Sequence, residues 1–78
     1  MSAHELVKRI RLSLGLSQMA FAQQMQVSFS TISRWENGHA QPNRLAIITL
    51  IDLCQKEQTC LELLPDLQVL SGNKSILS

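Results

Sequence analysis

The 78-residue sequence predicts a small all-α domain of five helices. Apolar residues recur at steps of three and four, which is the spacing of one face of a helix. Serines stand directly before several of these stretches, where N-caps are favoured, and glycine follows two of them as a C-terminal cap does. The apolar fraction of 45% suffices for one modest core. We therefore expect a single domain over residues 1–70 and a flexible tail over 71–78.

The first helix is expected over residues 3–14. Ser2 and Glu5 match the S-x-x-E capping box, which predicts the start of a helix at this point. Gly15 follows the last apolar position and is expected to end the helix. The buried stripe of this helix is expected to consist of Leu6, Ile10 and Leu14.

The second and third helices are expected over residues 18–25 and 29–36, each preceded by a serine suited to the N-cap. Only "QVS" separates them. Two short helices with so short a connection cannot lie antiparallel and flush, so they cross at a steep angle and form a helix-turn-helix unit. Asn37 and Gly38 are expected to end the third helix, since both tolerate a left-handed backbone.

The fourth helix is expected over residues 44–56 and is apolar around most of its circumference, which predicts burial on more than one side. Thr59 and Glu62 form a second capping box in front of a fifth helix over residues 60–64. Pro65 is expected to stop or bend that helix.

The two cysteines, Cys54 and Cys60, show neither a zinc-binding pattern nor a disulfide framework. We expect buried, reduced thiols and hence a cytoplasmic protein. No apolar run approaches the ~18 residues that a membrane span needs, and the charged N-terminus is unlike a secretory signal.

The net charge of +1 is distributed unevenly along the chain. Residues 1–44 hold five basic and two acidic residues, a net charge of +3, whereas residues 45–78 hold two basic and four acidic residues, a net charge of −2. This asymmetry is expected if only the first half of the chain meets phosphate.

The stretch "GLSQMAFAQQMQVSFSTISRWENGHAQP" resembles the phage-repressor-like (Cro/cI-type, XRE) helix-turn-helix family of bacterial transcription regulators. The resemblance covers about residues 4–56, and "LSQ", "VS", "SRWENG" and the following proline are its most specific parts. It implies a lambda-repressor-like fold in which the helix over 29–36 lies in the major groove of DNA. The family commonly has glycine where this chain has Gln26, so a positive φ costing about 1 kcal/mol is expected there.

The resemblance also implies which side chains face DNA. Val27, Ile32 and Trp35 would face the core. The residues expected at DNA are Gln18, Ser28, Phe29, Ser30, Thr31, Ser33, Arg34, Asn37 and Arg44.

Arg34 is the best candidate for direct readout, because a guanidinium can bond guanine O6 and N7 together. The alternative is a solvated side chain or a phosphate contact. Ser28 is first an N-cap. Phe29 is left open: it lies three residues from Ile32 and so can pack on the core, or it can face outward and meet a thymine methyl group.

Gln18 begins the second helix, where it can hydrogen-bond a phosphate or reach a base. Asn37 and Arg44 flank the loop after the third helix and are expected at the phosphate backbone. Glu36 lies in the last turn of its helix, where negative charge opposes the macrodipole. The resemblance supplies Arg11 as its partner, in an ion pair that would lock the first helix to the third.

The leading hypothesis is a sequence-specific regulator of double-stranded DNA, most simply a repressor, associated with the nucleoid when bound. So few basic residues favour a homodimer on a two-fold related operator, with the region Ile47–Leu70 as its surface. The alternative for that region is that the fifth helix simply covers the fourth. An antitoxin that also binds a toxin, and a protein-interaction module without DNA binding, are the competing functions.

An enzyme is disfavoured, because the sequence has no Gly-rich phosphate loop, no metal-ligand cluster and no paired nucleophile and base. We expect no catalytic residue, no metal and no cofactor.

Overall fold

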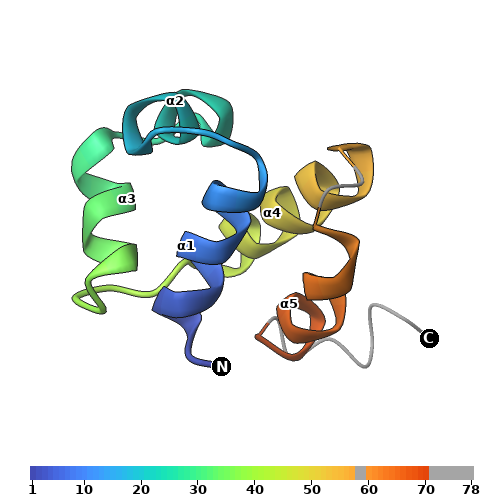
Figure 1. Ribbon diagram of the computed structural model, residues 1–78. Coiled ribbons are helices and arrows are strands. Elements are labelled where there is room, and N and C mark those ends of the chain that lie inside the picture. The colour runs from blue at the N-terminus through green and yellow to red at the C-terminus, as the bar shows by residue number, and fades with distance from the viewer. Residues whose placement is uncertain (58–59, 71–78) are drawn as a thin grey trace.

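The computed structural model describes residues 1–57 and 60–70, and this part of the chain forms helices and no strand. In Figure 1, α1 lies between α3 on one side and α5 on the other, and α2 crosses the top of the molecule. The all-α, five-helix prediction is confirmed. The elements are α1 (Ala3–Ser13), α2 (Gln18–Met25), α3 (Phe29–Glu36), α4 (Arg44–Glu57), the 3₁₀ helix η1 (Leu61–Leu63) and α5 (Leu64–Leu70).

Serine N-caps begin the first three helices, as predicted. The hydroxyls of Ser2, Ser17 and Ser28 each accept a hydrogen bond from the backbone amide three residues later. At the start of α1 the Ser2 hydroxyl also donates to the Glu5 carboxylate at 2.9 Å. This hydrogen bond holds the pKa of Glu5 below its usual value.

The turn between α2 and α3 places Gln26 in the left-handed region, at φ 58° and ψ 42°. The predicted positive φ at this non-glycine residue is confirmed. Its amide donates to the Gln23 carbonyl at 3.2 Å, and the next amide, of Val27, donates to the Ala22 carbonyl at 3.0 Å. These two bonds satisfy carbonyls at the end of α2 that would otherwise lack a partner.

The core collects apolar side chains from all five helices. Ile32 and Trp35 of α3 are buried, as predicted, and Val27 is partly buried and packs against the core. In α4 the apolar surface is only partly covered, because Ile48 is 44% and Leu45 is 72% exposed. The largest fully buried side chains include Phe21, Leu6, Ile10, Ile32, Leu50 and Leu67.

The C-terminal region differs from its predicted boundaries. A 3₁₀ turn, η1, precedes α5, which continues to Leu70. Pro65 lies in the first turn of α5 and does not stop it, because the first amides of a helix have no intrahelical acceptor and a missing N–H costs nothing there. The proposed cap at Thr59 and the tail over 71–78 lie outside the described residues.

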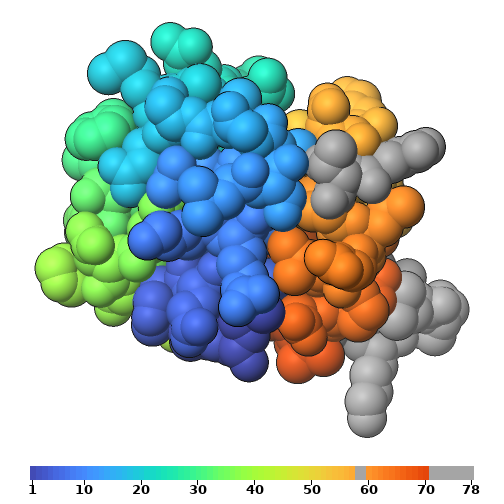
Figure 2. Space-filling model, viewed as in Figure 1, coloured from blue at the N-terminus to red at the C-terminus, as the bar shows by residue number. Residues whose placement is uncertain are grey.

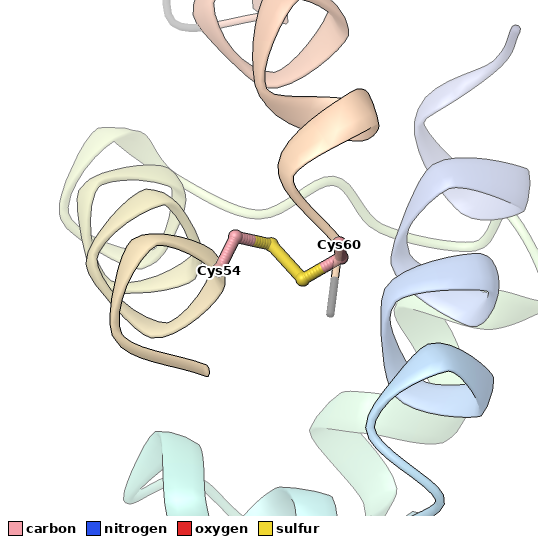
Figure 3. Close-up of a disulfide and its surroundings, with 2 residues drawn as sticks. All are labelled: Cys54 and Cys60. Carbon is pink, nitrogen blue, oxygen red and sulfur yellow. A yellow bond between two sulfur atoms is a disulfide. The ribbon is translucent and has the colours of Figure 1, made fainter. Parts of the chain in front are cut away.

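Cys54 and Cys60 form a disulfide, so the prediction of reduced thiols is wrong (Figure 3). Both residues are fully buried, as expected. The last turn of α4 and the start of η1 bring their Cα atoms to 5.2 Å, within the range that a disulfide spans. The cysteines therefore no longer indicate a cytoplasmic location.

None of the helices in the described part of the chain is both long enough and apolar enough to cross a bilayer.

Candidate nucleic-acid interface

The two sides of α3 have different surroundings. Ile32 and Trp35 hold one side in the core, while Ser30 and Arg34 are exposed on the other. Phe29 is 48% exposed, so it is not one of the buried core residues and part of its side chain is open to the outside. The helix is therefore anchored along one stripe and presents a mixed polar and aromatic stripe to the outside.

Hydroxyl groups gather at the N-terminal end of α3. The Ser28 hydroxyl accepts from the Thr31 amide at 3.1 Å and lies 2.8 Å from the Thr31 hydroxyl and 3.1 Å from the Ser30 hydroxyl. Ser30 is exposed and Thr31 is half-buried at the side of the helix. These groups can both donate and accept hydrogen bonds, which suits base edges and phosphate oxygens alike.

At the other end of α3 the Asn37 side-chain amide donates to the hydroxyl of the half-buried Ser33 at 3.3 Å. Asn37 itself is exposed, and Gly38, at φ 77°, then turns the chain away from the helix. Arg44 is the first residue of α4 and is exposed.

A two-pronged ion pair joins α1 to α3. Arg11 Nε donates to Glu36 Oε2 at 2.7 Å, and Arg11 Nη2 donates to Glu36 Oε1 at 3.1 Å. The side chains are 12% and 4% exposed respectively. Arg11 Nη1 also donates to the Leu16 carbonyl at 3.0 Å, so the guanidinium connects the end of α3 to the loop before α2.

Gln18 brings α2 into the same network. Its side-chain amide donates to Glu36 Oε1 at 3.0 Å. Glu36 therefore receives hydrogen bonds from α1 and α2 at once, and the three helices meet at one carboxylate. Gln18 is half-buried, at the edge of the surface that α3 exposes.

The surface around α2 and α3 has little negative charge. Between Gly15 and Asn43, a stretch described throughout, Glu36 is the one acidic residue, and its charge is balanced by Arg11. Arg34 is exposed on α3. In Figure 2 the atoms of α2 and α3 form one side of the molecule, opposite to η1 and α5. Within this stretch, therefore, a polyanion would meet no carboxylate that lacks a cationic partner.

Sequence reasoning missed a groove beside α3. An open groove of about 640 Å³ lies between the end of α2, α3 and the start of α4. Its polar lining is uncharged, and Asn43 in it also caps α4 by accepting from the Ala46 amide at 2.8 Å. Nothing in the sequence shows that these amides and hydroxyls converge, because they come from separate segments. The polar lining residues are Gln24, Gln26, Thr31, Gln41, Asn43 and Thr49.

Comparison with known families decides the class of this protein. The model of the helix-turn-helix family matches residues 7–57, more than half of the chain. The chain belongs to the XRE-type, Cro/cI-like helix-turn-helix family. The helix-turn-helix domain of this family is a DNA-binding regulatory domain and not a catalytic one. Comparison with curated proteins and with solved structures gave no match.

Proposed function

We propose that this helix-turn-helix protein recognises a specific sequence of double-stranded DNA through α3 in the major groove, and that it represses transcription by occupying a promoter. The observation that carries the proposal is the two-sided character of α3. Ile32 and Trp35 fix one side in the core, and the other side presents side chains suited to base edges. The one acidic residue of α3, Glu36, is paired with Arg11.

The side chains of α3 suggest a division of roles. Arg34 is exposed and can bond guanine O6 and N7 together, a contact worth about 1–3 kcal/mol of discrimination. The exposed ring of Phe29 can pack on a thymine methyl group. Ser30, Thr31 and Ser33 supply hydroxyls to bases or to phosphates.

Phosphate contacts are assigned to residues around this helix. Arg44 and Asn37 lie at the exposed loop after α3, and Gln18 begins α2. Ser28 remains primarily the N-cap of α3, with its hydroxyl within reach of a phosphate. These contacts set the register of the helix on DNA, and Arg44, the one cation among them, contributes to the salt-dependent affinity.

A homodimer is the active form in this proposal. One copy carries few exposed cations for phosphate, so two copies on a two-fold related operator, with half-sites about 34 Å or a multiple apart, would bind more tightly. The outward apolar residues of the expected dimer region, Ile47–Leu70, support this assignment. They are Ile48, Leu61, Val69 and Leu70.

The test is a selection of binding sites from a random DNA library, followed by affinity measurements on the selected site. The selected sites are expected to be two-fold related. Arg34→Ala is expected to relax preference at one base pair of each half-site while leaving non-specific binding nearly intact. Arg9→Ala, which removes an exposed arginine of α1, is the matched control and should keep the preference. If Arg34→Ala lost affinity equally for every sequence, Arg34 would contact phosphate and not a base. A library that yields no consensus would refute sequence-specific binding.

The exposed apolar residues of α5, with Val69 at 77%, favour a second candidate. An antitoxin-type regulator would use the same face for DNA and would bind a toxin through this region. A protein-interaction module without DNA binding would show no salt-dependent retention on DNA, so the same affinity measurements separate it. In either DNA-binding role the protein would act in the cytoplasm, at the nucleoid.

A further inference from the structure

We propose that Cys54 and Cys60 form a reversible redox modification site, which controls how firmly η1 and α5 are held on α4 and thereby regulates dimerisation. The proposal rests on the proposed function, because its consequence is a change in the dimer and in operator binding. The disulfide itself is an independent observation.

The disulfide lies where the C-terminal segment joins the rest of the domain. Cys54 is in the last turn of α4, and Cys60 directly precedes η1 (Figure 3). Beyond Cys60 the chain buries Leu63 and Leu67, and α5 packs on both α4 and α1. The bond therefore fixes the first residue of this segment to α4.

The segment held by the disulfide carries most of the outward apolar side chains assigned to the dimer. Leu61, Val69 and Leu70 are exposed on η1 and α5, whereas the recognition helix α3 lies on the other side of α1 (Figure 1). A change in the state of the cysteines would consequently act on the dimer surface and leave the DNA-reading side chains in place.

The position of the bond suits a switch better than a structural staple. The cysteines are six residues apart, and a short loop constrains the unfolded chain less than a long one does. The core contributed by Leu6, Ile10, Phe21 and Ile32 lies in helices that the bond does not join. Both the oxidised and the reduced chain can therefore keep the helix-turn-helix fold.

The compartment favours a reversible bond. A regulator that binds DNA works in a reducing cytoplasm, where structural disulfides are rare and those that do form are usually transient and redox-sensing. The chain belongs to a family of DNA-binding regulatory domains, and it also has a disulfide between neighbouring elements. A bond that forms under oxidising conditions and is later reduced is compatible with both observations.

The reaction is thiol–disulfide exchange with a small disulfide such as oxidised glutathione. The thiolate of one cysteine attacks a glutathione sulfur, forms a mixed disulfide and releases one glutathione thiolate. The second cysteine thiolate attacks the cysteine sulfur of the mixed disulfide and releases the other. The protein loses two electrons and two protons, and oxidised glutathione gains them as two glutathione thiols. Because both cysteines are buried, exchange requires local opening of the η1 end.

Reduction weakens the attachment of the segment. Without the bond, η1 and α5 are held by the packing of Leu63, Leu67 and their neighbours, so a larger fraction of molecules has the segment undocked. The reduced form is expected to dimerise less tightly and to bind its operator less tightly, by on the order of tenfold.

The experiment uses the full chain equilibrated in mixtures of reduced and oxidised glutathione. Free thiols are counted by alkylation and mass spectrometry, dimerisation is measured by sedimentation, and operator affinity is measured on the selected site. We expect one two-electron transition between the dithiol and the intramolecular disulfide, with tighter dimerisation and tighter operator binding on the oxidised side.

Three results would overturn the proposal: thiols that never pair, a disulfide that glutathione never reduces in the folded protein, and two forms that interconvert with equal dimerisation. If neither form binds DNA, the proposed function fails, while the thiol count and the sedimentation data still decide the switch.

A variant that cannot form the bond provides the control. The double variant Cys54→Ala/Cys60→Ala is expected to dimerise like the reduced wild-type chain and to ignore the glutathione ratio. Because alanine leaves small cavities, its helical content is compared with that of the reduced wild type. A double variant that still responds to glutathione would place the response elsewhere and refute the assignment.

Discussion

Removing one partner of the Arg11–Glu36 ion pair should destabilise the domain strongly. In Arg11→Met the Glu36 carboxylate, whose side chain is 4% exposed, loses both guanidinium bonds and keeps the one from Gln18. An uncompensated buried charge costs about 3–5 kcal/mol. Since the Gln18 side-chain amide still donates to the Glu36 carboxylate, we expect a destabilisation at the lower end of this range, about 3 kcal/mol. A domain of this length has a free energy of unfolding of about 4–12 kcal/mol, so much of it would be lost.

The partner variant and the double variant make the reasoning quantitative. Glu36→Met leaves the Arg11 guanidinium with its bond to the Leu16 carbonyl, and its side chain is 12% exposed, so about 2–3 kcal/mol is expected. In Arg11→Met/Glu36→Met no buried charge remains, and apolar replacement of such a pair is often near neutral, so we expect stability within about 1 kcal/mol of the wild type. The two single effects sum to at least about 5 kcal/mol and the double effect is at most about 1, so the cycle gives a coupling of at least about 4 kcal/mol.

The assay is urea unfolding followed by helical circular dichroism at a fixed, oxidised state of the cysteines. The slope of the free energy of unfolding against urea concentration should stay constant while the urea concentration at the midpoint falls, because the surface exposed on unfolding is unchanged. Arg9→Met, on the exposed part of α1, is the control and should change stability by less than about 0.5 kcal/mol. A buried, uncompensated charge is not the cause if the two single effects simply add in the double variant, or if Arg11→Met destabilises the domain no more than Arg9→Met does. If Arg11→Met is unfolded even without urea, Glu36→Gln, which keeps a hydrogen-bond acceptor, takes its place in the stability measurement.

Three further predictions concern DNA and local structure. Arg44→Ala should weaken binding to all sequences and reduce the salt slope of the affinity by about one unit; an unchanged slope would remove Arg44 from the phosphate contacts. Gln26→Gly should raise the free energy of unfolding by about 0.5–1 kcal/mol, because glycine relieves the left-handed backbone at φ 58°. Gln24→Gly, in the last turn of α2, should lower the free energy of unfolding by about 1 kcal/mol in the same measurement. If both glycine variants changed the free energy of unfolding in the same direction, the left-handed backbone at Gln26 would not be the cause. Ser2→Ala should raise the pKa of Glu5, measured by NMR titration, because the hydrogen bond from the Ser2 hydroxyl is the main cause of its lowering; an unchanged pKa would contradict this cause. In the wild type, the stability that comes from the lowered pKa is present above the pKa of the unfolded state and is lost as pH falls through the pKa of the folded state.

Local chemistry explains why most of the fold could be predicted from the sequence. Serine caps and glycine stops act within one turn, so α1, α2 and α3 begin where their caps indicated. The C-terminal boundaries were less predictable. Proline is compatible both with the end of one helix and with the first turn of the next, and the sequence around Pro65 does not separate these cases.

The features that sequence reasoning missed depend on tertiary packing. Phe29 lies three residues from the buried Ile32, so periodicity allowed both a core position and an outward one. The bond from Gln18 to Glu36 has no signature, because a glutamine beside a helix start has many possible partners. Cys54 is brought to its disulfide partner by the way α4 and η1 pack, which a six-residue spacing does not reveal.

The placement of charge on opposite sides of the molecule has a consequence for kinetics. The exposed Arg34 lies on α3, whereas Glu62 and Asp66, both exposed, lie on η1 and α5 at the far side (Figure 2). Such a separation is an electric dipole, and the field of a polyanion exerts a torque on it before any contact forms. The molecule would be turned with α3 foremost as it approaches, so a larger fraction of collisions would be productive, and added salt would slow association by shortening the range of that torque.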